Sequence, residues 1–181
     1  MIRCGMALTL AAALAACSTS RDRGASEQAA GGVDVTRTHL GGQIARAQIA
    51  VEPVNAADAN TPDWQGVSDA VERQLARHGY TIAANRPASE QIARVTVTQG
   101  SRTALTTGWP AGLGAGSRQQ NALATLLDVR IQRRSDGSVF WQGRAVAETP
   151  AGTPRAQVVE RLAEALFRDF PGESGRTIRV R

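Results

Sequence analysis

The stretch LATLLDVRIQRRSDGSVFWQGRAVAE (residues 123–148) decides the fold, because it predicts a long β-hairpin whose register can be argued. A two-residue loop at Asp136 and Gly137 would place Ile131 opposite Gln142, an apolar residue beside a polar one. A three-residue loop over 135–137, with Gly137 left-handed, instead pairs Ile131 with Trp141. A slip of one residue exchanges the two faces, so the apolar pattern favours the three-residue loop.

The chosen register gives the hairpin one apolar and one polar face. It pairs Val129 with Gly143 and Leu127 with Ala145 on the apolar side. On the polar side, it sets Asp128 opposite Arg144, a favourable cross-strand pair of charges.

Other segments with alternating polarity predict further strands. These are residues 33–39, 45–54 and 92–99, with a short last strand at 176–180. The first of them alternates only weakly and is expected at an edge of the sheet. Pro53 suits the end of the second strand.

Two amphipathic helices are expected. The first covers Thr61–Tyr80, with Thr61 as cap and Gly79 at its end. Its apolar stripe consists of Trp64, Val67, Val71, Leu75 and His78. The second covers Pro154–Phe170, with Thr153 as cap. Its stripe consists of Val158, Val159, Leu162, Leu166 and Phe170.

This order of elements predicts an α+β domain over residues 33–181. We expect a single antiparallel or mixed sheet of about five or six strands, with both helices packed on one face.

The beginning of the chain predicts export and lipidation. An apolar run, Ala7–Ala16, precedes Cys17 in the context Leu14-Ala15-Ala16-Cys17, the pattern of a bacterial lipoprotein signal. The run is too short to cross a hydrocarbon core of about 30 Å as a helix. Residues 1–16 would be removed, Cys17 would carry the lipid, and 17–32 would form a flexible tether. The alternatives are an ordinary secretory signal cut near Ala16, or a cytosolic protein with an apolar N-terminus.

The residue after Cys17 bears on location. Ser18 favours the outer membrane, because Asp at this position favours retention in the inner membrane of enteric bacteria. Cys4 lies in the removed segment, so the mature chain would have no disulfide.

The charge of the chain is basic, with a formal net charge of +5. All 21 basic residues are arginine. Coding bias in a GC-rich genome explains this, and contact with anionic lipid headgroups is the functional alternative. We expect no nucleic-acid partner, because the arginines are scattered over every segment and the compartment is wrong.

The chain predicts no catalytic residues, metal site or cofactor. His39 and His78 have no ligand spacing between them or with a carboxylate cluster. The serines lack a nucleophile motif: Ser68, Ser89, Ser101 and Ser117. Most carboxylates decorate solvated helix faces: Asp63, Asp69, Glu72, Glu160 and Glu164.

A glycine-rich stretch, GWPAGLGAG (108–116), matches neither the dinucleotide fingerprint nor a Walker loop. Trp109 in this stretch is either exposed, where it would contact a membrane or a partner, or folded back to cap the sheet.

Several segments together carry a resemblance to a known family. They are VTRTHLGGQIARAQIAVEP (35–53), LARHGY (75–80), RIQRRSDGSVFWQGRA (130–145) and RLAEALFRDFPGESG (161–175). With the lipoprotein signal, they resemble the domain of unknown function 4136 family of bacterial lipoproteins. The resemblance implies an envelope lipoprotein with an α+β domain, and it implies no activity for named residues.

Three hypotheses for function follow. The first is a non-enzymatic binding or assembly module, anchored by lipid to the outer membrane and facing the periplasm. The second is an envelope hydrolase or transferase that acts on peptidoglycan or lipid through carboxylates assembled only in three dimensions. The third is a subunit of a larger assembly, in which the strand at 33–39 pairs with a partner strand.

Overall fold

A computed structural model of the chain describes residues 31–41, 44–108, 123–150 and 152–181, all within the unit Gly31–Arg181. Cys17 and Trp109, the two residues singled out for lipid and surface contact, lie outside the described residues.

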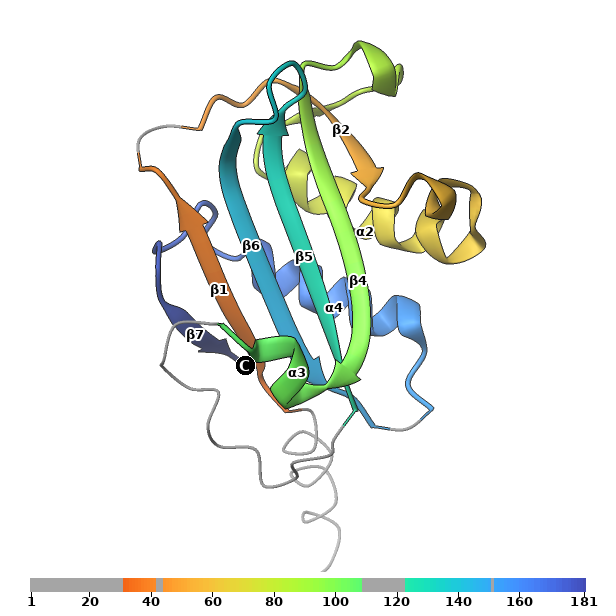
Figure 1. The fold of residues 1–181 in the computed structure, drawn as a ribbon, viewed down its shortest axis with the longest axis vertical. Coiled ribbons are helices and arrows are strands. Elements are labelled where there is room, and N and C mark those ends of the chain that lie inside the picture. The colour runs from red at the N-terminus through yellow and green to blue at the C-terminus, as the bar shows by residue number, and fades with distance from the viewer. Residues whose placement is uncertain (1–30, 42–43, 109–122, 151) are drawn as a thin grey trace, which may run out of the picture. The chain divides into compact units, whose positions relative to one another are not determined.

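The centre of the unit is a mixed sheet of seven strands in the part of the chain that the structure describes, with the order β3-β2-β4-β5-β6-β1-β7 (Figure 1). The strands are β1 (Val33–His39), β2 (Gln48–Pro53), β3 (Thr81–Ile82), β4 (Gln91–Ser101), β5 (Leu123–Arg133), β6 (Val139–Glu148) and β7 (Thr177–Val180). β2 runs parallel to β3 and β4, and the remaining neighbours are antiparallel. The α+β class is confirmed, but the expected five or six strands are too few. The missing one, β3, is two residues long and therefore shows no periodicity.

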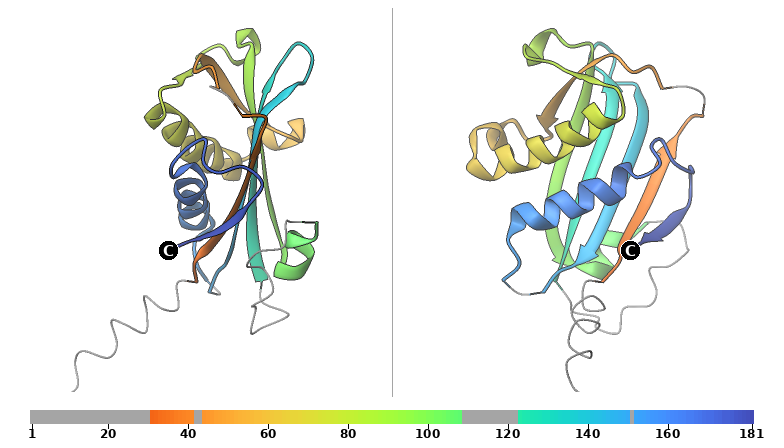
Figure 2. Two further views of the ribbon diagram at one scale, coloured as in Figure 1. Left: turned by 90° about the vertical axis from the view of Figure 1, so that its left-hand side faces the viewer. Right: turned by 180° about the vertical axis from the view of Figure 1, so that it is seen from behind.

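The two expected helices are α2 (Pro62–Arg77) and α4 (Arg155–Phe167), and both cover the same face of the sheet (Figure 2). Thr61 caps α2 by accepting a hydrogen bond from the Trp64 N–H. The expected cap of α4 is wrong: Pro154 occupies that position, and the Thr153 hydroxyl donates to the Pro150 carbonyl at 2.9 Å. Among the described residues, every helix is too short or too polar to span a membrane.

The opposite face of the sheet carries a one-turn helix, α3 (Arg102–Thr106), which the sequence did not predict (Figure 2). Its cap is Ser101, whose hydroxyl accepts from the Ala104 N–H. Five residues are too few for an amphipathic stripe, so no pattern in the sequence predicts this helix. Two 3-10 turns, η1 (Ala56–Asn60) and η2 (Arg86–Ala88), complete the described helical segments.

The hairpin register is confirmed at every predicted pair, including Ile131 with Trp141 and Asp128 with Arg144. The loop itself differs from the predicted three-residue loop. The Arg133 N–H donates to the Ser138 carbonyl at 2.9 Å, so four residues close the turn, and Gly137 has a φ of 70°. A bulge between Ile131 and Gln132 then restores the predicted register.

The expectation that residues 33–39 form an edge strand is wrong. β1 pairs with β6 on one side and with β7 on the other, for example Val33 with Val180. The edge that the assembly hypothesis required is therefore covered by the C-terminal strand from Val33 to Thr36. Local alternation does not reveal this neighbour, because β7 is far away in the sequence.

The core lies between the sheet and the helices α2 and α4, and its centre is aromatic. Trp141 and Phe167 are fully buried, with ring centroids 5.4 Å apart. Gly143 makes this packing possible, because a Cβ there would come within 2.2 Å of the Trp141 ring. Trp64, from the predicted apolar stripe of the first helix, is also buried.

Arg37 enters this core from β1 and binds the C-terminal end of α4. Its side chain is buried and donates to the carbonyls of Ala165 at 3.0 Å, Leu166 at 2.8 Å and Arg168 at 2.7 Å. The last carbonyls of a helix lack intrahelical donors, so the guanidinium satisfies groups that would otherwise be unpaired. Burial lowers the pKa of Arg37, but a guanidinium stays charged.

Candidate functional site

The face of the sheet that α2 and α4 leave open carries a cluster of charged side chains. We call it the polar face and define it by six residues: Glu52, Arg94, Asp128, Arg130, Arg134 and Arg144. β2, β4, β5 and β6 supply five of them, and Arg134 follows β5 directly. Alternation places these side chains opposite the core, because neighbouring residues of a strand point to opposite faces.

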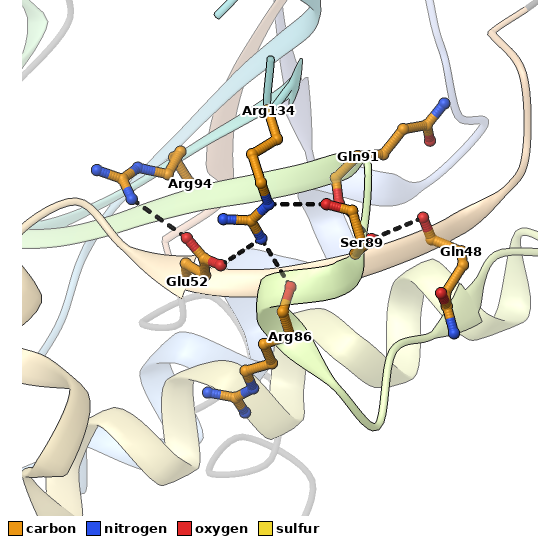
Figure 3. A network of polar contacts seen from close by, with 7 residues as sticks. All are labelled: Gln48, Glu52, Arg86, Ser89, Gln91, Arg94 and Arg134. Atoms are coloured by element: carbon orange, nitrogen blue, oxygen red, sulfur yellow. Dashed lines mark hydrogen bonds and ion pairs between the residues drawn. The ribbon is translucent and has the colours of Figure 1, made fainter.

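One half of the polar face is organised by Arg134 (Figure 3). Its guanidinium donates to the Glu52 carboxylate at 2.6 Å and to the carbonyls of Ser89 at 2.7 Å and Arg86 at 2.8 Å. Arg94 reaches the other oxygen of Glu52 at 3.3 Å. One carboxylate thus joins two arginines, and Arg134 ties the turn around η2 to the sheet.

The other half of the polar face is centred on Asp128. Arg144 Nε lies 2.8 Å from its carboxylate, Arg130 Nε lies 3.5 Å away, and the Gln142 amide donates at 3.1 Å. The predicted pairing of Asp128 with Arg144 is confirmed.

The polar face is basic. Four arginines meet two carboxylates, an excess of two positive charges, and the arginine side chains remain 32–47% exposed. Exposed pairs of this kind contribute little to stability. Guanidinium groups held in place by carboxylates are well suited to bind carboxylate or phosphate oxygens in bidentate fashion.

A second ionic cluster lies beside α3 and is largely buried. Arg102 forms an ion pair with Asp34, and both side chains are almost fully buried. Arg102 also approaches Glu148 at 3.6 Å, and Arg179 approaches Asp34 at 3.7 Å. Burial raises the pKa of Asp34, and the two arginines oppose this shift.

This cluster bears on the hydrolase hypothesis, which requires two carboxylates in an open cleft. Asp34 and Glu148 do share one neighbourhood, but Arg102 bridges them. A bridging guanidinium stabilises both anions and holds α3 on the sheet. This arrangement supports a structural role.

A cavity of about 230 Å³ lies elsewhere, between the N-terminal end of α2 and the strands β2 and β4. Its apolar lining consists of Pro53, Trp64, Val67, Val95 and Val97. The indole N–H of Trp64 is buried and has no hydrogen-bond partner in the described structure. Arg155 at the start of α4 also lines the cavity and pairs with Asp63 at 3.3 Å.

The two histidines have structural surroundings. The His39 Nε2 contacts the Gly172 carbonyl at 3.0 Å, and its Nδ1 accepts from the Gly41 N–H at 3.2 Å. His78 packs against Phe170 with ring centroids 5.3 Å apart, and burial lowers its pKa. Within the described ranges, no three histidine or acidic side chains gather in a way that could hold a metal ion.

The described serines that the sequence singled out also make structural contacts. The Ser68 hydroxyl donates to the Gln65 carbonyl at 3.2 Å, and the Ser89 hydroxyl donates to the Gln91 carbonyl at 2.8 Å. Ser101 caps α3. No sequence motif identified the polar face or the cavity. Alternation indicates which side chains of β2 and β4 face outward, but the order of the strands decides which of them meet.

Comparison with known proteins gives distant likenesses. No protein-family model matches the chain. Over 80 residues the chain is 34% identical to an uncharacterized protein of Zymomonas mobilis, and this match covers 42% of the chain and 30% of that protein. The chain therefore spans less than a third of that curated relative.

Solved structures show the fold. A PDZ domain protein from Parabacteroides distasonis is similar with a TM-score of 0.54 and 10% identity, over 85% of this chain and 40% of that one. A DUF4136 family protein from Bacteroides thetaiotaomicron is similar with a TM-score of 0.43 and 12% identity, over 78% of this chain and 97% of that one. The PelC dodecamer from Paraburkholderia phytofirmans also has a TM-score of 0.43, with 16% identity over 71% of this chain and 92% of that one. The family that the sequence resembles is thus represented among the similar structures, and likenesses this distant say nothing of function.

Proposed function

We propose that the protein is a lipid-anchored component of the bacterial cell envelope that acts as a non-enzymatic binding or assembly module. In this proposal, Cys17 carries the anchor, and the domain faces the periplasm from the outer membrane. The observation that supports the binding role is the polar face. There, six charged side chains hold one another in place through ion pairs on the open side of a sheet.

The surroundings of these charges support binding rather than catalysis. Both carboxylates of the polar face are engaged by arginines, Glu52 by Arg94 and Arg134, and Asp128 by Arg130 and Arg144. Both oxygens of each carboxylate already contact a guanidinium group, so neither carboxylate is free to contact a substrate. The exposed guanidinium edges remain open to a partner with acidic groups.

The anchor is tested by metabolic labelling with a palmitate analogue in a bacterium that processes lipoproteins. We expect label on the full chain and on Cys4→Ser, which changes the cysteine that would be cut away. Cys17→Ser should lose the label and leave the outer-membrane fraction. Label that persists on Cys17→Ser, or an unlabelled full chain, would contradict the anchor.

The binding role is tested by isolating the lipidated protein from membranes and identifying what accompanies it by mass spectrometry. A matched pair of variants makes this specific. Arg130→Glu reverses a charge on the polar face, whereas Arg73→Glu reverses one on the helix side of the domain. A partner of the polar face should be lost from the first variant and kept by the second.

The enzymatic alternative is tested with the same preparation. Release of soluble fragments from peptidoglycan by the full chain, and its loss in Asp34→Asn, would favour a hydrolase over a binding module.

A further inference from the structure

The strand β4 has a free edge in the described structure. β2 accompanies it only as far as the pair Pro53 and Val95, whereas β4 continues to Ser101 (Figure 1). Beyond Val95, the described residues pair with β4 only through β5, on its other side.

The main-chain groups along this edge can be assigned. The Val54 N–H donates to the Val95 carbonyl at 3.0 Å, so the carbonyl of Val95 points toward β2. Alternate residues of a strand direct their N–H and C=O groups to the same side, so those of Val97 and Gln99 point to the free edge. A row of donors and acceptors of this kind is a template for another strand.

The cavity of about 230 Å³ lies at this edge, because Val95 and Val97 of β4 belong to its lining. An engineered apolar cavity of about 150 Å³ holds a benzene molecule. The cavity beside β4 therefore has room for one large apolar side chain.

Two further features indicate a peptide as occupant. The Trp64 side chain lines the cavity, is only 6% exposed, and its N–H has no partner in the described structure. A buried donor without a partner is costly, and a carbonyl of a bound chain would satisfy it. The charged lining residues are Asp58, Asp63 and Arg155, which leaves one excess negative charge.

We infer that the free edge of β4 binds an extended segment of a partner protein. The segment adds a strand beside Val97 and Gln99, inserts a large apolar side chain under Trp64, and carries a basic residue close to Asp58 and Asp63. This inference goes beyond the proposed binding role, because it adds a second binding surface at the edge of the sheet, apart from the polar face, and assigns it a segment that carries a basic residue.

The test selects peptides from a random-dodecapeptide display library on the purified full chain in detergent. Enriched peptides should carry apolar residues at alternate positions with Lys or Arg nearby. Their affinities are then measured by fluorescence anisotropy. Because lipid on Cys17 is not needed, the result is independent of the palmitate experiment.

Three variants make the test specific. Trp64→Phe keeps an aromatic ring at this position and removes the N–H, so affinity should fall about threefold to tenfold. Gln99→Pro removes an edge N–H and should weaken binding at least about tenfold, because proline is tolerated at a free edge but cannot donate. Gln99→Ala keeps that N–H and should stay within about twofold. Far-UV circular dichroism verifies that each variant folds.

Two results would overturn the inference. One is a failure to enrich any peptide, or peptides that bind Trp64→Phe and Gln99→Pro as tightly as the unchanged protein. The other is a dimer in sedimentation experiments that Gln99→Pro converts to a monomer, because the edge would then belong to a second copy of this chain.

Discussion

Arg37→Met should be among the most destabilising single substitutions in this domain. Methionine is similar in length and apolar, so it keeps most of the packing and removes the cost of burying a charge. It also removes every donor that the guanidinium presents to Ala165, Leu166 and Arg168. The substitution therefore opposes two terms, the relief of desolvation and the loss of hydrogen bonds.

The hydrogen bonds should dominate. A bond from a charged donor contributes about 1.5–3 kcal/mol, and each buried carbonyl left unpaired costs about 1–3 kcal/mol. The three bonds share one side chain, so their contributions do not add fully. We expect a loss of about 3–5 kcal/mol in the free energy of unfolding, a large part of the roughly 5–15 kcal/mol of a typical domain.

The assay is urea unfolding followed by far-UV circular dichroism. With a slope of about 2 kcal/mol per molar urea, the midpoint should fall by about 2 M without a change in slope. Arg77→Met is the matched control, because Arg77 also lies in the last turn of a helix but is exposed. It should change stability by no more than about 0.5 kcal/mol. If Arg37→Met costs less than about 1 kcal/mol, desolvation outweighs the carbonyl contacts and the reasoning is refuted.

Four other predictions concern packing and charge. Gly143→Ala should destabilise the protein by about 1–3 kcal/mol in thermal unfolding, because its Cβ would meet the Trp141 ring. Gly66→Ala, whose Cβ meets no atom within 4 Å in helix α2, should instead stabilise it by about 0.5–1 kcal/mol. Arg102→Ala leaves Asp34 buried without its main partner and should cost about 3–5 kcal/mol near neutral pH. Since burial already raises the pKa of Asp34, this cost should shrink as acid protonates the carboxyl, and equal losses at neutral and acidic pH would contradict the assignment. Asp136 accepts hydrogen bonds from Ser138, which lower its pKa to about 2. The contribution of Asp136 to stability should be complete above its usual pKa of 3.8 and disappear as the pH falls toward about 2. In Ser138→Ala, NMR of the Asp136 carboxyl carbon should show the pKa of Asp136 move back upward.

Local alternation in the sequence predicted the positions of most strands but not all of their neighbours. Alternation located β1, β2, β4, β5 and β6, and it selected the hairpin register correctly, because a shifted register would bury polar side chains. It failed for β1 as an edge strand, since the neighbour β7 comes from the other end of the described chain. Pairing between distant segments depends on the whole sheet, which no local window contains.

The contacts at the candidate sites also fall into two groups, those that the sequence predicted and those that depend on the tertiary structure. Asp128 opposite Arg144 followed from register alone. Arg134 reaches Glu52 only because β2 and β4 are neighbours and the turn after β5 folds beside them. The cavity at Trp64 likewise exists because β2 ends before β4 does, under the first turn of α2.

Sequence alone therefore determined the α+β class, the positions of both long helices and the hairpin register, and it predicts that Cys17 carries a lipid. These features rest on periodicity and on short motifs, whose physical causes act within a few residues. Only the tertiary structure decided the strand order, the burial of Arg37 under α4 and the free edge of β4. Each of these depends on which distant segments shield one another from water, and that is a property of the folded chain as a whole.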